Sequence, residues 1–501
     1  MSPAPCQQTT AAAHRETNRL LAINTGLLTL TELLTKVLSL VLIILVARTL
    51  GPAQMGIYAF ALSFIQIFEI VVNFGLERYI QREVGRHSQL AGPLFPQIFS
   101  LKVFLYLLIW VAILGLSVFF FDSPLKRQVV LILSLTLFFR TNLTSTTAFF
   151  RATLQARYEA LVIISLRLIY TLAGVAAVLA GYGLLTLVSL ELLATATACS
   201  LAWWLSRRHI GWRWQRPVGT ELWSLARAAR DFFLLRLVLV VFTAIDMLML
   251  SWLSGDVATG FYAVAARLTT ALDFFPEAFG GAFLPVLSRR AREGWQAFTE
   301  VFQNYYKYLL IIGLGLAVGL SGLAAGGIAT LFGTAFLPAV ATLRWLALAL
   351  LLDYVNRCLV NIFIAVDEEQ QLLKIFGLAT GAKLLFAFLL IPLYQQNGAA
   401  LAAVLAEGVI LAFLLFSVGL SRLAPLRLLH LAKRPLLAAA LTAGAILGGS
   451  FWPLPLALQM PLAGLTYGLC LLLARALSWQ EVLAVRDLLR GPRRSHAAAA
   501  S

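Results

Sequence analysis

The chain contains fourteen long apolar segments separated by short polar connections. Most of them reach the roughly 20 residues that a helix needs to cross about 30 Å of hydrocarbon. Because the bilayer core offers no water to backbone N–H and C=O groups, lipid-exposed spans of this kind must be helical. The segments are 20–49, 55–76, 97–121, 128–150, 160–180, 184–206, 232–253, 259–287, 308–332, 339–366, 372–394, 398–420, 436–451 and 462–477.

Composition argues against a soluble protein. Hydrophobic residues make up 60% of the chain and charged residues only 12%, whereas soluble domains carry about 25% charged residues. The net charge of +16 would suit nucleic-acid binding if the basic residues lined a soluble face, but no soluble domain is visible. We therefore predict an all-α polytopic membrane protein of about 14 transmembrane helices, without a nucleic-acid partner.

Basic residues concentrate on one side of the predicted spans. With the N-terminus inside, 27 Lys and Arg lie in or beside the inward segments, whereas the outward connections hold Arg48, Lys126 and Arg127. Cytoplasmic loops carry such an excess, so both termini are predicted to be cytoplasmic. The long inward segment 207–231 interleaves tryptophans with arginines. It is either an amphipathic segment on the anionic inner leaflet or a plain linker with interfacial anchors.

An internal repeat links the turn between the first two spans to the turn between the seventh and eighth. Residues 51–61 and 255–265 share the pattern G-x4-G-[IF]-Y-A-x-A, in which glycine permits a tight turn and close helix approach. Six spans separate the copies, so both have the same orientation, as in parallel transporter repeats. We predict two six-helix lobes in a parallel pseudo-twofold repeat, with two helices appended at the C-terminus.

The predicted organisation follows from the spans and the repeat. Its parts are an N-terminal tail (1–19), an N-lobe (20–206), a basic and aromatic linker (207–231), a C-lobe (232–420), a cytoplasmic loop (421–435), the last two helices (436–478) and a C-terminal tail (479–501).

The chain resembles the polysaccharide-transporter branch of the MOP exporters. The resemblance is carried by the fourteen spans in a 6+6+2 pattern and by Ala-Arg-Thr-Leu-Gly-Pro at 47–52 followed by Gly-Ile-Tyr at 56–58. The stretch from Gly260 through Arg267 to Phe-Leu-Pro-Val-Leu-Ser-Arg at 283–289 also resembles the related lipid II flippases.

This resemblance implies a V-shaped pair of lobes around a central cavity that works by alternating access. It implies a bacterial inner-membrane flippase for undecaprenyl-diphosphate-linked oligosaccharide repeat units, used to make O-antigen, capsule or exopolysaccharide. A polysaccharide polymerase and a chain-length regulator would be its protein partners. H⁺ or Na⁺ would be the coupling ion, and no cofactor is implied.

Charged residues inside the spans are the candidate functional groups. Nine basic and eight acidic side chains lie there, and each costs about 2.5–3.5 kcal/mol at the bilayer centre on insertion scales. Lys102, Arg236 and Arg344 lie near span ends, within snorkelling reach of the headgroups. Glu32 with Lys36 and Asp353 with Arg357 are spaced i,i+4 and are expected to pair on one helix face. The deep charges without an obvious partner at local spacing are Arg140, Arg267, Lys383, Glu69, Asp246 and Glu407.

Deep cations could attract the diphosphate, and deep acids could carry a coupling ion. Lys36 and Arg267 rank first for the substrate because the resemblance implies that spans 1, 2, 7 and 8 line the cavity; Arg140 and Lys383 rank below them. The candidate ion-coupling acids are Glu69, Asp246 and Asp273. For each of these residues, the competing interpretation is a packing salt bridge.

Two other functions remain open from the sequence. A cation-coupled multidrug/toxin antiporter of the same superfamily usually has twelve spans and a more acidic N-lobe cavity. An integral membrane polysaccharide polymerase or ligase would need catalytic residues on a sizeable outward loop, and the outward loops here are short. Four widely separated cysteines give no metal spacing, and no nucleotide-binding motif is present. We therefore expect a transporter, not an enzyme.

Overall fold

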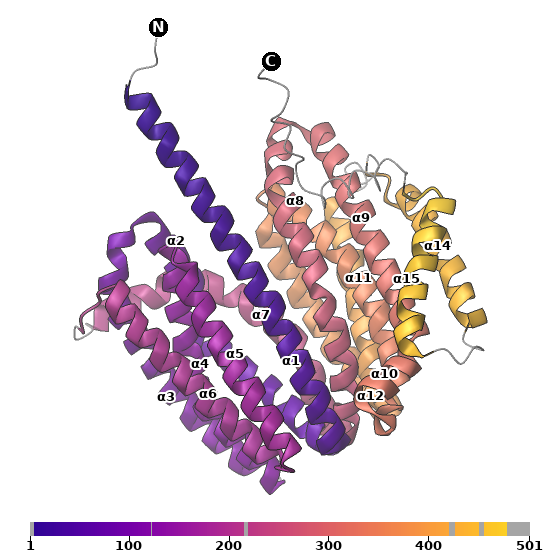
Figure 1. The fold of residues 1–501 in the computed structure, drawn as a ribbon, viewed down its shortest axis with the longest axis horizontal. Helices are drawn as coiled ribbons and strands as arrows, with labels where there is room; N and C mark the ends of the chain where they lie inside the picture. Colours follow the sequence, from indigo (N-terminus) through magenta and orange to yellow (C-terminus); the bar gives the residue numbers. More distant parts are fainter. Residues whose placement is uncertain (1–4, 122, 215–218, 420–425, 450–454, 478–501) are drawn as a thin grey trace, which may run out of the picture. The chain divides into compact units, whose positions relative to one another are not determined.

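The computed structural model describes residues 5–121, 123–214, 219–419, 426–449 and 455–477. All regular elements of this described part are helical, which confirms the all-α prediction (Figure 1). The helices are α1 (Pro5–Asn73), α2 (Leu76–Arg86), α3 (Ala91–Phe120), α4 (Pro124–Ala152), α5 (Ala156–Leu179), α6 (Leu184–His209), α7 (Gly219–Thr270), α8 (Phe274–Glu293), α9 (Trp295–Gly322), α10 (Ala324–Phe332), α11 (Ala339–Ala365), α12 (Glu369–Val418), α14 (Leu428–Gly449) and α15 (Leu456–Leu473).

The number of membrane crossings agrees with the prediction of about fourteen. Ten helices of the described chain are long and apolar enough to span a membrane, and Leu458–Leu473 is a shorter apolar helix. Three of the ten are about twice as long as one crossing requires. These three contain a non-helical residue, namely Gly51, Gly255 or Gln395. Each therefore supplies two crossings, and the short helix completes the set.

The chain divides into two compact units, each described here by itself. The first holds residues 1–267 and 391–396, and the second holds residues 268–390 and 397–501. This division places most of α7 with α1–α6, whereas the predicted N-lobe ends at residue 206. The predicted tail 479–501 lies outside the described residues, and residues 5–19 of the predicted N-terminal tail are the beginning of α1.

Helix α4 is the centre of the first unit, where it packs against α1, α2, α3, α5 and α6. Its buried face is rich in hydroxyl side chains, which would be costly in a membrane if they lacked partners. The hydroxyls of Thr141 and Thr146 instead donate to the carbonyls of Leu137 and Asn142, both at 2.9 Å. Small side chains that satisfy themselves within the helix let neighbouring helices approach closely.

Helix α2 was not predicted as a separate element. The sequence 76–86 is polar overall, but Leu76, Ile80 and Val84 recur every four residues and are fully buried. They join a cluster with Phe95 of α3 and Leu225 of α7. The signal was an amphipathic repeat in a segment too short and too polar to span the membrane.

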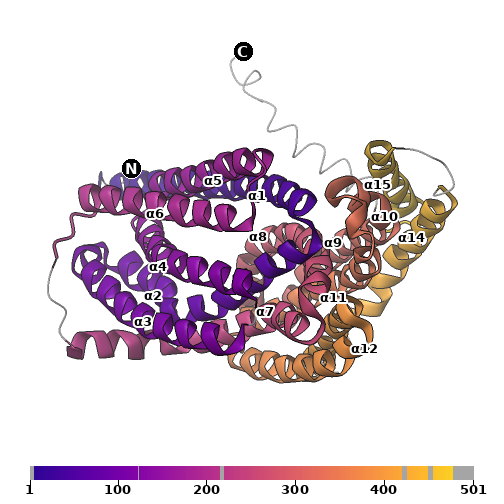
Figure 2. The same cartoon turned by 90° about the horizontal axis from the view of Figure 1, so that it is seen from below.

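The second unit is built around α9. Helices α8, α11 and α14 pack against it, and an aromatic row that includes Phe298, Phe302 and Tyr305 is buried along its length. The C-terminal pair α14 and α15 also lies on this helix (Figure 2). The hydroxyl of Tyr467 in α15 donates to the carbonyl of Ile311 at 2.7 Å, so these two helices are part of the unit's core.

The predicted orientation can be tested at two exposed positions. A cysteine at Tyr182, 58% exposed between α5 and α6, should react with a membrane-impermeant thiol reagent added outside cells. A cysteine at Arg290, whose side chain is 43% exposed in α8, should react only after the membrane is made permeable. Labelling of the parent protein sets the background, since Cys470 is partly exposed. Reversed labelling would contradict the predicted orientation.

Candidate functional site

The two copies of the repeat have the same backbone conformation. Gly51 has φ 75° and ψ 178°, and Gly255 has φ 83° and ψ 178°. Only glycine adopts this region of backbone space readily. Each glycine reverses the chain between two spans, and the tyrosine seven residues later, Tyr58 or Tyr262, is buried in the first unit.

Each repeat tyrosine donates a hydrogen bond to a buried carboxylate. The Tyr58 hydroxyl donates to Glu191 Oε2 at 3.2 Å and lies 3.1 Å from the hydroxyl of Tyr170. The Tyr262 hydroxyl donates to Asp246 Oδ2 at 2.7 Å. The repeat therefore carries a tyrosine–carboxylate contact as well as a turn. The sequence pattern contains both tyrosines, but our prediction used only its glycines.

Arg140 lies between two carboxylates in the first unit. One of its terminal nitrogens bonds to Glu191 of α6, and another lies 3.8 Å from Glu69 of α1. Local spacing offers no partner to Arg140 or Glu69, and their partners come from distant helices within one ion-pair network. Glu191 was counted among the span acids but not selected as a candidate. Pairing between distant helices cannot be seen in i,i+4 spacing.

Three cations occupy α1, α5 and α7 of the same unit. The Arg267 guanidinium donates to Ser39 Oγ at 2.5 Å and lies within electrostatic range of Arg167. Lys36 is three residues before Ser39 on α1, hence on the same face, and its ammonium is 3.2 Å from Glu32, as predicted. The Arg267 side chain is exposed, and those of Lys36 and Arg167 are partly exposed.

Lys102 is fully buried, which contradicts the predicted snorkelling. Its ammonium donates to Asn73 Oδ1 at 2.7 Å and to the carbonyl oxygen of Thr141. The prediction measured depth along one helix and could not show that neighbouring helices cover the position. Arg236 and Arg344 are exposed, as snorkelling requires.

The second unit contains a similar arrangement around Arg357. This guanidinium bonds to Asp353 at 2.7 Å, which confirms the predicted i,i+4 pair, and lies 3.7 Å from Asp273. Asp273 and Glu277 are spaced i,i+4, and like charges at this spacing repel, so the sequence predicts that at least one of them needs a cation or a proton. Arg357 provides that cation for Asp273.

Lys383 is 3% exposed in α12 and interacts electrostatically with Glu407 of the same helix. Glu407 also accepts a hydrogen bond from Asn356 of α11 at 2.8 Å. The cation is thus enclosed with a carboxylate in the core of the second unit, whereas Arg267 and Lys36 retain accessible surface.

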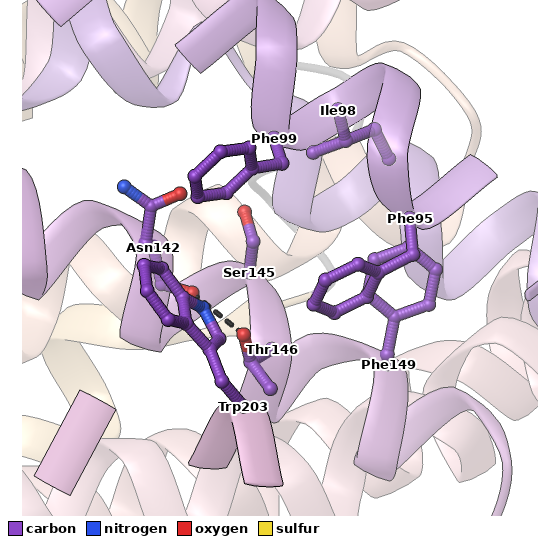
Figure 3. Close-up of a pocket in the computed structure, with 8 residues that line it drawn as sticks. All are labelled: Phe95, Ile98, Phe99, Asn142, Ser145, Thr146, Phe149 and Trp203. Carbon is purple, nitrogen blue, oxygen red and sulfur yellow. Dashed lines mark hydrogen bonds between the residues drawn. The ribbon is translucent and has the colours of Figure 1, made fainter. Parts of the chain in front are cut away.

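A small pocket in the first unit contains none of the predicted site residues. Helices α3, α4 and α6 line it with four aromatic rings, one isoleucine and three polar side chains (Figure 3). The lining residues are Phe95, Ile98, Phe99, Asn142, Ser145, Thr146, Phe149 and Trp203. The lining has no charged group, so it does not suit a phosphate. No group of three potential metal ligands occurs among the residues that the structure describes.

A family model described as "Polysaccharide biosynthesis protein" matches residues 21–290, which is more than half of the chain. The chain belongs to this family. The match covers the first copy of the repeat, the second copy and all of the Arg140 network. No curated protein matches the chain in sequence.

Solved structures establish the fold of this family member. The lipid II flippase MurJ in an inward closed conformation gives a TM-score of 0.72 at 14% identity, covering 92% of this chain and 99% of that chain. An inward-facing multidrug resistance MATE family transporter of the MOP superfamily gives 0.67 at 16% identity, covering 78% and 95%. The fold is therefore that of the MOP superfamily, as the resemblance implied.

The Arg140 network should contribute strongly to stability. Glu191→Gln removes the closer carboxylate, and leaving the partly buried Arg140 guanidinium with only the more distant Glu69 should cost about 2 kcal/mol. The matched control is Glu32→Gln, because the Glu32 side chain is 54% exposed and its pair with Lys36 should contribute less than about 1 kcal/mol. Melting of the purified variants in detergent should show a large decrease for the first and a small one for the second. Equal decreases would contradict the structural role of Glu191.

Proposed function

We propose that this protein is a flippase that moves undecaprenyl-diphosphate-linked oligosaccharide repeat units across the bacterial inner membrane by alternating access. The family match and the MOP fold support a transporter for polysaccharide synthesis. In this proposal both termini are cytoplasmic, and the product feeds O-antigen, capsule or exopolysaccharide assembly. A polymerase and a chain-length regulator would be its partners.

The group of Lys36, Arg167 and Arg267 is the observation that carries the proposal. Arg167 and Arg267 repel each other electrostatically, and Lys36 lies one helical turn before Ser39, which accepts a hydrogen bond from Arg267. A diphosphate would offset this repulsion, and guanidinium groups bind phosphate oxygens through paired N–H donors. We therefore retain Lys36 and Arg267 as substrate ligands and add Arg167. For Arg140 and Lys383, enclosed with carboxylates, we propose a structural role.

Ion coupling is supported by two sets of carboxylates that share a guanidinium. Glu69 and Glu191 share Arg140, and Asp353 and Asp273 share Arg357. In each set the more distant carboxylate can accept a proton or Na⁺ while the closer one still neutralises the arginine. Glu69 and Asp273 are the more distant members, so we propose them as coupling acids. Asp246, hydrogen-bonded to Tyr262, is a third.

A multidrug antiporter is the second candidate because of the structural similarity to a MATE transporter. An exporter of cationic drugs needs accessible acids, and the first unit exposes both an acid, Glu32, and a cation, Arg267, inside predicted spans. A strain lacking the protein separates the candidates: loss of surface polysaccharide supports the flippase, and drug sensitivity with normal polysaccharide supports the antiporter.

Substitutions of Arg267 should separate the contribution of its charge to export from the contribution of its hydrogen-bond geometry. Arg267→Ala should abolish surface polysaccharide while the protein still accumulates in the membrane. Arg267→Lys should restore export only in part, because an ammonium lacks the planar pair of donors. Arg344→Ala, at an exposed span arginine of the second unit, is the control and should leave export normal. Polysaccharide staining and membrane immunoblots measure the two quantities.

The assignment fails if Arg267→Ala lowers protein abundance and export in proportion. That result would give Arg267 a packing role through its bond to Ser39. Full export by Arg267→Lys would also contradict recognition by paired guanidinium donors.

Removal of a coupling acid should make transport independent of the ion gradient. Glu69→Gln keeps the side-chain shape but cannot exchange a proton. We expect export to fall and its remaining rate to no longer respond to dissipation of the proton or sodium gradient. Glu32→Gln, at an exposed carboxylate, should retain the wild-type response. Lipid-linked oligosaccharide uptake by inverted vesicles measures this, and an unchanged gradient response in Glu69→Gln would remove Glu69 from the coupling site.

A further inference from the structure

The second glycines of the two repeat copies touch the opposite copy. A Cβ atom added to Gly56 would lie 1.7 Å from the carbonyl oxygen of Asp256, and one added to Gly260 would lie 2.0 Å from the carbonyl oxygen of Pro52. Separations under 3 Å do not occur for real Cβ atoms. Backbone, not side chain, blocks the space, so no rotamer change relieves the clash.

The contact is reciprocal. Pro52 and Asp256 are equivalent positions of the repeat, each directly after the glycine that reverses the chain, and Gly56 and Gly260 are equivalent as well. Gly56 therefore contacts the carbonyl of Asp256, and Gly260 contacts the equivalent carbonyl, that of Pro52. Such matching contacts are those of an isologous interface around a two-fold axis. A single tight contact could be accidental, but two matching ones at equivalent positions follow from the symmetry of the repeat.

This contact is supported from α4 by a second interaction. The Lys126 ammonium lies 2.6 Å from Asp256 Oδ1 and donates to Ser251 Oγ at 2.8 Å. Ser251 Oγ in turn donates to Asp256 Oδ1 at 2.8 Å. The Lys126 ammonium also lies 4.6 Å from the centre of the Phe60 ring, which belongs to the first copy. One cation thus bridges the two copies of the repeat.

We propose that Gly56 and Gly260 are positioning residues that close the outer end of the transport pathway, with the Lys126–Asp256 pair as its latch. The inference rests on the proposed function, because alternating access requires the two repeats to separate at this end. Each contact between a glycine Cα–H group and a carbonyl oxygen contributes little binding energy. The turns can therefore part without extracting interlocked side chains, and breaking the ion pair releases them.

Residues on the inward side of the contact provide the probe. Ser39 precedes the Gly51 turn by about 18 Å of helix, and Arg267 follows Gly260 by about 10 Å; the two side chains contact each other. A cysteine at Ser39 should be shielded from an impermeant thiol reagent outside while the turns touch. Its rate of labelling, above that of the chain with Ser39 intact, reports opening of the outer end.

Alanine at either glycine should hold the turns apart. Gly56→Ala and Gly260→Ala should each raise the labelling rate of the Ser39→Cys chain about tenfold, because the added methyl group overpacks the contact. The control is Gly115→Ala in α3, where an added Cβ meets nothing within 4 Å, and its labelling rate should not change. An unchanged rate in both test variants, at normal protein abundance, would overturn the proposal.

The latch provides a second test if the alanine variants do not accumulate. Lys126→Asp and Asp256→Lys should each raise the labelling rate, and the double variant should restore it by re-forming the pair. Unchanged labelling in both single variants would overturn the latch. The labelling assay needs no substrate, so it tests the contact separately from the proposed function. If labelling rises as expected but surface polysaccharide does not depend on the protein, the contact is supported and the proposed function is rejected.

Discussion

The bilayer does not accept an isolated charge, and this constraint organises both units of the protein. In each unit one guanidinium is held between two carboxylates from different segments of the chain, Arg140 in the first and Arg357 in the second. When both carboxylates are ionised, such a set carries a net negative charge, whereas a simple ion pair is neutral. It joins segments that are distant in sequence, and one carboxylate of each set lies farther from the guanidinium than the other.

The first unit also brings two guanidinium groups close to each other. Arg267 contacts the neutral hydroxyl of Ser39 and has a second guanidinium, Arg167, nearby. Positive charge inside the bilayer is costly. In the proposed function, a lipid-linked diphosphate would bring negative charge to these cations on a hydrocarbon chain that is soluble in the bilayer.

The sequence predicted the helical class, the number of crossings, the repeat and the two i,i+4 pairs, because each depends on hydrophobicity, glycine or local spacing. It did not predict the partners of Arg140 or the burial of Lys102, since these depend on which helices become neighbours. The depth of a residue along a span can be read from its own helix, whereas its exposure depends on which helices pack over it. Helix α2 was missed for another reason: its apolar face is real, but hydropathy averaged over 76–86 conceals it.

The first unit includes residues 391–396 as well as residues 1–267, and Ser254 donates to the carbonyl of Ile391 at 3.3 Å. During synthesis the ribosome must deliver more than a hundred further residues before this part of the unit becomes available. A chain released before residue 391 would lack the segment that Ser254 contacts, and the first unit would remain incomplete.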